Sequence, residues 1–177
     1  MTEFLLDFLN AVLKIEGGIV DLHYDNTERP GRSEDDRTTI FDLYCTLKTG
    51  EQIIIEMQNH NQNFFQVITL YYASRLIQEQ GEDKIGKNWN FELKPVYSVN
   101  IANFELDNDN IEKPSDKYVS YVQLFDVEAF DVLYKKLTFA FFELPLFTKE
   151  VHQLESSIDC WMYVLKNLVR LNNSEKS

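Results

Sequence analysis

The sequence has few cysteines, few prolines and glycines, and no long apolar run. No run approaches the roughly 18 or more apolar residues that a membrane-spanning helix needs, so a membrane span is not expected. Glu3 and Asp7 stand where a secretory signal would have basic residues. Cys45 and Cys160 form neither a metal-type CxxC pair nor a disulfide framework, which favours the reducing cytoplasm. Both lie in apolar stretches, and we expect both to be buried and inert.

Basic residues are also scarce. The chain has 17 Lys and Arg against 29 Asp and Glu, giving a formal net charge of −12. Proteins that bind DNA through its phosphate backbone are usually basic, at least locally. The charge therefore argues against tight, nonspecific DNA binding. It still permits a nuclease if a divalent metal neutralises the site, and it leaves open an acidic partner-binding protein with no nucleic-acid role.

The length of 177 residues and the hydrophobic fraction of 44% fit one domain, which we place at residues 1–171, followed by a polar tail at 172–177. A polar segment at 25–37, with an acidic stretch at 34–36, is expected to be a loop. The order of helix, three strands, helix, strands and helix predicts an α/β fold. Apolar periodicity predicts helices at 3–13, 61–80 and 155–171 and strands at 19–24, 39–47, 52–58, 94–106, 118–128 and 137–147.

Two neighbouring apolar strands each carry one carboxylate, Asp42 and Glu56, and the turn between them decides whether these meet. A two-residue loop, Thr49-Gly50, would send Asp42 to the opposite face of the sheet. A three-residue loop beginning at Lys48 places Asp42 directly opposite Glu56. Gly50 suits the left-handed backbone that commonly ends such a loop. We therefore predict the second register, with about 5 Å between the two Cβ atoms.

Two carboxylates that face each other destabilise a sheet unless something neutralises them. A hard divalent cation, Mg²⁺ or Mn²⁺, would do so. Gln58 lies two residues beyond Glu56 and projects from the same face. Its amide could orient a water molecule or a phosphate but could not act as a general base. The residues alone leave open a plain alternative, two acids on a solvated sheet face.

An aspartate in one strand and Glu-x-Gln in the next resembles the PD-(D/E)XK nuclease motif, with Gln58 at the position of the more usual lysine. Further ordered matches extend over most of the chain and are similar to one branch of that superfamily, the recombination-promoting nuclease or transposase family. The matching segments are residues 6–13, 41–45, 55–58, 70–74, 89 with 93–97, 142–145 and 161–166.

This resemblance implies a restriction-endonuclease-like αβββαβ core with a mixed central sheet flanked by helices. It implies a Mg²⁺- or Mn²⁺-dependent endodeoxyribonuclease that acts on DNA during transposition or recombination. The cysteines and the lack of a long apolar run place the expected protein in the cytoplasm, without membrane contact. Asp42 and Glu56 would be the metal ligands and, with Gln58, the catalytic residues. A homodimer is left open.

Other residues are weaker candidates. Arg75, Tyr72 and His60 are candidate substrate contacts, and Glu28 is a candidate extra acid, although a solvated loop glutamate is the simpler interpretation. Family members tend to have an arginine where this chain has Ile68, and they usually begin with further residues, so the resemblance predicts a short copy. The alternative function is a catalytically weakened or inactive member that serves as a DNA- or protein-interaction module.

Overall fold

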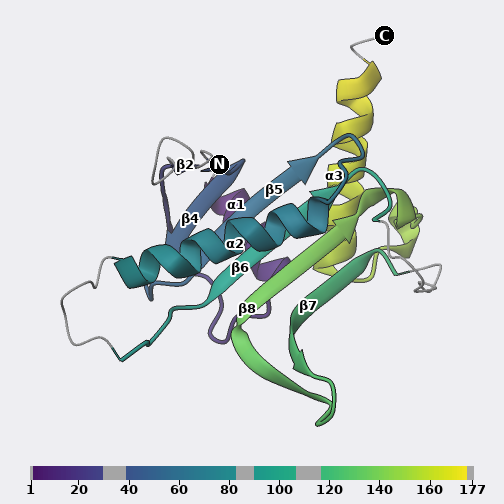
Figure 1. The fold of residues 1–177 in the computed structure, drawn as a ribbon. Coiled ribbons are helices and arrows are strands. Elements are labelled where there is room, and N and C mark those ends of the chain that lie inside the picture. The colour runs from purple at the N-terminus through teal and green to yellow at the C-terminus, as the bar shows by residue number, and fades with distance from the viewer. Residues whose placement is uncertain (1, 30–38, 83–89, 107–116, 175–177) are drawn as a thin grey trace.

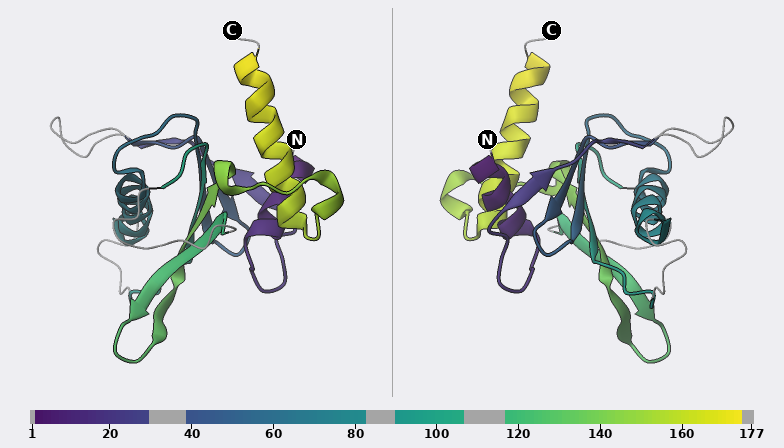
Figure 2. Two further views of the ribbon diagram at one scale, coloured as in Figure 1. Left: turned by 90° about the vertical axis from the view of Figure 1, so that its right-hand side faces the viewer. Right: turned by 90° about the vertical axis from the view of Figure 1, so that its left-hand side faces the viewer.

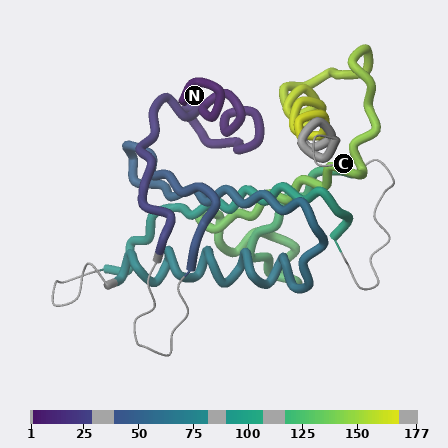
Figure 3. The backbone as a smooth tube through the Cα atoms, turned by 90° about the horizontal axis from the view of Figure 1, so that it is seen from above, coloured from purple at the N-terminus to yellow at the C-terminus, as the bar shows by residue number. Residues whose placement is uncertain are grey.

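A computed structural model of the chain describes residues 2–29, 39–82, 90–106 and 117–174. Its middle layer is a six-stranded sheet, with one helix on one face and two helices on the other (Figures 1 and 3). No helix in the described ranges is both long and apolar enough to cross a bilayer. The elements are α1 (Thr2–Val12), β1 (Leu22–Tyr24), β2 (Glu28–Arg29), β3 (Thr39–Ile40), β4 (Leu43–Leu47), β5 (Gln52–Gln58), α2 (Phe65–Glu82), β6 (Val96–Ala102), β7 (Val119–Asp126), β8 (Asp131–Glu143), the 3₁₀ turns η1 (Leu144–Leu146) and η2 (Val151–Gln153), and α3 (Ser157–Ser174).

The sheet order is β1-β4-β5-β6-β8-β7, and β2 and β3 form a separate two-stranded ribbon. The pairs β5–β6 and β6–β8 are parallel, whereas β1–β4, β4–β5 and β7–β8 are antiparallel. The sheet is therefore mixed. The predicted α/β class and the predicted order of the main elements are confirmed.

Both faces of the sheet are covered because its central strands are apolar on both sides. On β5, Ile54 faces α2, whereas Ile53 and Ile55 face α1 and α3. Figure 2 shows the sheet edge-on between these two helical layers. The buried apolar residues on the α2 side are Phe41, Tyr44, Ile54, Phe65, Ala73, Leu76, Val96, Ala102, Leu106, Leu137, Phe139 and Phe141.

Several boundaries differ from those predicted. The strand expected at 39–47 is interrupted at Phe41 and Asp42. The helix expected from residue 61 begins only at Phe65, because Phe64 has a positive φ of 64° that a helix cannot include. The strand expected from residue 137 begins at Asp131, since β8 continues into a long hairpin with β7.

The remaining differences are smaller. The first strand covers only the last three residues of the predicted 19–24, and α3 continues past 171 to Ser174. Part of the loop expected at 25–37 pairs as β2 with β3, with Glu28 opposite Ile40. The acidic stretch at 34–36 and the end of the predicted tail lie outside the described residues.

The two cysteines differ in their surroundings. Cys45 is fully buried, which confirms the expected burial, and this burial raises the pKa of its thiol to about 12. The expectation for Cys160 is wrong, because this residue is exposed. The sheet-facing side of α3 carries Ile158, Trp161 and Met162, and the cysteine between them points outward.

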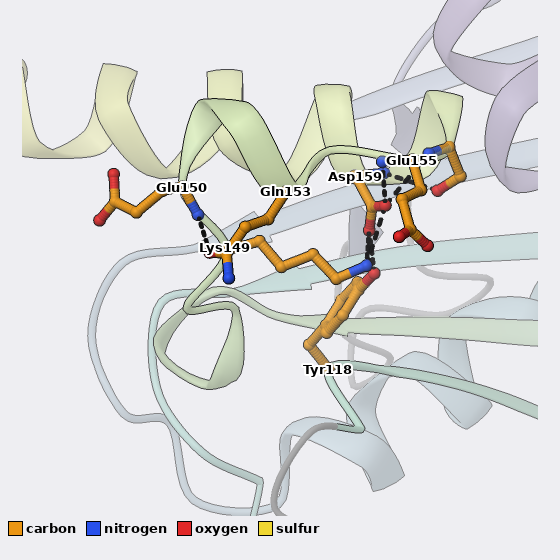
Figure 4. A network of polar contacts seen from close by, with 7 residues as sticks. Tyr118, Lys149, Glu150, Gln153, Glu155 and Asp159 are labelled. Carbon is orange, nitrogen blue, oxygen red and sulfur yellow. Dashed lines mark hydrogen bonds and ion pairs between the residues drawn. The ribbon is translucent and has the colours of Figure 1, made fainter.

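A buried aspartate fixes the start of α3 (Figure 4). Tyr118, just before β7, and Lys149 both donate hydrogen bonds to the Asp159 carboxylate, which also accepts from the backbone N–H groups of Glu155 and Ser156. Burial by itself would raise the pKa of Asp159, but these hydrogen bonds hold that pKa well below its ordinary value. The charged carboxylate thus ties α3 to the β7 side of the sheet.

We predict that Asp159→Asn lowers the free energy of unfolding by about 2 kcal/mol at neutral pH, the range for hydrogen bonds to a charged group. Because the pKa of Asp159 is lowered in the folded state, its contribution is present above the ordinary value of 3.8 and is lost as the pH falls further. Urea unfolding at several pH values should show the parent and the variant converging in acid. A constant difference between them would contradict this role.

Candidate active site

The turn between β4 and β5 has three residues. The Leu47 N–H donates to the Glu51 carbonyl at 2.9 Å, and the Gly50 N–H donates to the Leu47 carbonyl at 2.9 Å. Gly50 has a φ of +95°, a conformation that other residues rarely adopt. Leu43 pairs with Ile55, so Asp42 is the residue next in line opposite Glu56. The predicted register is confirmed.

The two acidic residues interrupt the regular strand ladder where they meet. The Asp42 backbone N–H donates to Glu56 Oε1 at 3.3 Å, and the Met57 backbone N–H donates to Asp42 Oδ2 at 2.8 Å. Each carboxylate thus accepts a backbone hydrogen bond from the opposite strand. This exchange explains why β4 begins only at Leu43.

Glu56 is buried and Asp42 is exposed. Glu56 is only 3% exposed, in line with its position beneath α2. Burial and, next, the negative charge of Asp42 raise the pKa of Glu56 to about 8, although the hydrogen bond from the Asp42 N–H opposes this. In the metal-free protein, Glu56 therefore holds a proton near neutral pH. A cation between the two side chains would favour the deprotonated, charged form of Glu56 instead.

Helix α2 runs back over β5 and places Tyr72 above the two acids. Gln80 anchors the end of the helix, since its Nε2 donates to Gln52 Oε1 at 2.7 Å and its Oε1 accepts from the Lys94 N–H at 2.8 Å. From that anchor, Tyr72 lies about 12 Å back along the helix and Glu56 about 13 Å along the strand. The pKa of Tyr72 is raised by burial and then by the charges of Glu56 and Asp42.

The structure brings only some of the other candidates close to the acids. Gln58 is half-buried on the same face as Glu56, near the N-terminal half of α2. Ile68, Tyr72 and Arg75 lie on one side of α2, at spacings of four and three residues. Ile68 is half-buried one turn before Tyr72, whereas Arg75, about one turn after it, is 7% exposed.

Two candidates lie farther out. His60 is exposed in the connection between β5 and α2. Glu28 is exposed in β2. It pairs with Ile40, and Ile40 lies two residues before Asp42 along the chain. Within the described ranges, no three His, Cys, Asp or Glu side chains gather in one cluster, so neither Glu28 nor His60 joins the two acids as a third ligand. The roles of Glu28 and His60 remain predictions.

A buried polar pair on β6 was not foreseen from the sequence. Asn100 is the cross-strand neighbour of Glu56 and is fully buried. Its Oδ1 accepts from Ser98 Oγ at 3.0 Å, and its Nδ2 donates to the Ser98 carbonyl at 3.1 Å. The alternation of β6 was a signal for it, because both polar residues fall on the side that faces α2, in a strand that is otherwise largely apolar. Asn100 therefore lies buried next to Glu56 on the side of the sheet that faces α2.

The donor set fits a hard divalent cation. Two carboxylates from neighbouring strands converge, one buried and one open to solvent, and such cations prefer carboxylate oxygens and water. Each carboxylate accepts one backbone hydrogen bond from the opposite strand. The remaining lone pairs on its oxygens can bind a cation. Asp42 and Glu56 would hold the cation, with solvent and substrate completing its shell.

The comparisons with known proteins agree with this geometry. A family model described as PD-(D/E)XK nuclease family transposase matches residues 2–177. Nucleases of this kind generally use divalent metals. No match is found among curated proteins or among solved structures.

We predict that the metal-free protein loses stability as the pH rises from about 5 to about 8, because folding keeps Glu56 protonated after the unfolded chain has released that proton. Glu56→Gln should remove this decline and stabilise the protein at the upper end of the range. Urea unfolding in the presence of a chelator measures the effect. An unchanged pH dependence in the variant would show that Glu56 is not the titrating group.

Proposed function

The chain belongs to the PD-(D/E)XK nuclease family transposases, and from this membership we propose that it is a metal-dependent endonuclease that cleaves DNA. Its catalytic residues would be Asp42, Glu56 and Gln58. One structural observation carries the proposal: Glu56 is buried opposite Asp42, close enough for the charge of Asp42 to raise the pKa of Glu56. A purely structural sheet would gain stability from an apolar residue at that position. A site that takes up a cation explains why an acid is there.

Mg²⁺ or Mn²⁺ at this site would supply positive charge that offsets charge developing on a phosphate, and it would make a water molecule more acidic. The protein's own contribution is to fix the two carboxylates at one point. The Lys48–Gly50 turn sets their register, and the two backbone N–H donors set their orientation. Because Glu56 is enclosed beneath α2, its charge is poorly screened by solvent.

Gln58 and Tyr72 would act on the substrate without exchanging protons. The Gln58 amide both donates and accepts hydrogen bonds, so it can hold a water molecule or a phosphate oxygen in place. Tyr72 keeps its hydroxyl proton at neutral pH, because burial and the nearby carboxylates raise its pKa. A neutral hydroxyl beside the acids can donate a hydrogen bond to a phosphate oxygen. We assign DNA cleavage during transposition or recombination as the setting for this chemistry.

We predict that the protein nicks or linearises plasmid DNA with Mg²⁺ or Mn²⁺ and that Asp42→Ala abolishes this activity. Asp21→Ala is the matched control, because it removes the same charge from an exposed ion pair with Lys48 that contributes little to stability. Calorimetry should show that Mn²⁺ binding is also lost in an Asp42→Ala, Glu56→Ala protein. A folded double variant that binds Mn²⁺ like the parent would rule out this site.

We further predict that Ile68→Arg increases the cleavage rate. Position 68 lies one turn before Tyr72 on the same side of α2, at about the level of Gln58. An arginine there would place a bidentate cation near the phosphate, and loss of one such group typically costs about 10²–10³ in rate. Single-turnover cleavage by the parent and the variant measures the gain.

The control for this experiment is Val67→Arg, because Val67 is exposed on the neighbouring, outward side of α2 and the variant adds the same charge. An Ile68→Arg protein that binds metal and DNA but cleaves no faster than the control would contradict the assignment. If the parent is inactive as well, the interaction-module alternative replaces the enzyme.

A further inference from the structure

The two outer strands of the sheet differ in how they are protected against pairing with another strand. An exposed strand edge presents backbone N–H and C=O groups that can recruit a further strand, and proteins usually shorten such edges or charge them. At one edge, β1 has three residues and lies between Asp21 and Asp25. At the other edge, β7 has eight residues, and no described strand pairs with its outer side. Only the first edge is protected.

Over most of its length, the sequence of β7 lacks the usual protective features. From Val119 to Phe125 it has no charged residue and no proline. Its pairing with β8 is irregular after Gln123. From Gln123 to Phe125, β7 advances one residue at a time, while its partners on β8 skip from Thr138 to Tyr134 and then to Val132. The extra residues therefore belong to β8, and β7 itself stays continuous.

The backbone groups that face outward on β7 can be identified from one hydrogen bond. The Glu143 N–H donates to the Tyr118 carbonyl at 2.9 Å. Because bonded and non-bonded pairs alternate in an antiparallel ladder, residues 120 and 122 also bond to β8. Val119, Tyr121 and Gln123 then direct their backbone groups away from β8, along the open edge.

The hairpin that contains this edge is also apolar. It extends away from the helices (Figure 2), and its exposed apolar side chains are 43–81% exposed. Since an aromatic side chain covers roughly 150–250 Å² when buried, the partly exposed side chains of this hairpin together present on the order of 600 Å² of apolar surface to solvent. A stable interface takes roughly 800 Å² from each partner, which strand pairing would bring within reach. The exposed apolar residues are Tyr121, Val122, Leu124, Phe125, Val127, Phe130 and Leu133.

We propose that β7 pairs antiparallel with β7 of a second copy of this chain, joining the two sheets into one. Full overlap of the uncharged stretch 119–125 with its copy places Val122 opposite Val122 and Tyr121 opposite Gln123. In that register the outward-facing residues meet each other, as hydrogen bonding requires. Val122 forms the non-bonded pair, in which side chains approach most closely.

Charge permits contact between two copies at this edge. Each chain carries a net charge of −12, so two copies repel over most of their surfaces. The stretch 119–125 brings no charge to the contact, and its first acid, Asp126, lies beyond the overlap. The proposal concerns assembly and does not depend on whether the chain cleaves DNA.

The test introduces a charge of either sign at position 122. Sedimentation of the full chain from nanomolar to high micromolar concentration should show a dimer. Val122→Lys and Val122→Glu should each weaken it roughly tenfold or more, because like charges then face each other. An equimolar mixture of the two variants should restore the dimer. Val164→Lys and Val164→Glu are matched controls on α3, with 44% exposure against 47% for Val122.

A second measurement does not depend on the variants. Hydrogen exchange of the parent should show the amides of Val119, Tyr121 and Gln123 protected at high concentration and unprotected at low concentration. The proposal is overturned by a parent that stays monomeric throughout, by dimers that survive in Val122→Lys alone, or by exchange that does not depend on concentration. Protection that arises only when an extended apolar peptide is added would assign the edge to a different partner and equally overturn it.

Discussion

The register of the β4–β5 hairpin is the constraint on which the candidate site depends. Side chains alternate across a strand, so a turn one residue shorter would move Asp42 to the other face and leave Glu56 alone beneath α2. Gly50 prevents this, because its positive φ closes a three-residue loop that other residues would strain. The break before Leu43 has the same origin. Once the acids face each other, Asp42 exchanges hydrogen bonds with β5 through side chains, and the regular ladder ends.

Helix α2 turns this pair of acids into an enclosed site. It is anchored at its C-terminal end, where Gln80 bonds to both Gln52 and the backbone of Lys94. An anchor at that end fixes the position of Tyr72 over the acids. The burial that raises the pKa of Glu56 is thus a consequence of helix placement. The same placement would strengthen the attraction of Glu56 for a cation, because solvent screens it poorly.

Local sequence signals were enough for the parts of the fold that depend on short-range geometry. The strand 52–58, the three-residue turn and the meeting of Asp42 with Glu56 follow from alternation and from one glycine. The features that sequence did not indicate depend on long-range pairing. The early start of β8 requires β7 as its partner. The outward position of Cys160 depends on how α3 rotates against the sheet, which Asp159 fixes through Tyr118.

An acidic chain that acts on DNA must overcome two repulsions, one between its own carboxylates and one between itself and the phosphates. Without a cation, the first is relieved by a proton on Glu56, and the second persists because the net charge of the chain is −12. A cation held by Asp42 and Glu56 would relieve both, since it displaces that proton and presents positive charge to the phosphate. Under the proposed function, cation and DNA therefore bind with favourable coupling, and such coupling is reciprocal. An acidic surface then limits binding to DNA that reaches the metal, which is a way to obtain cleavage without strong nonspecific attachment.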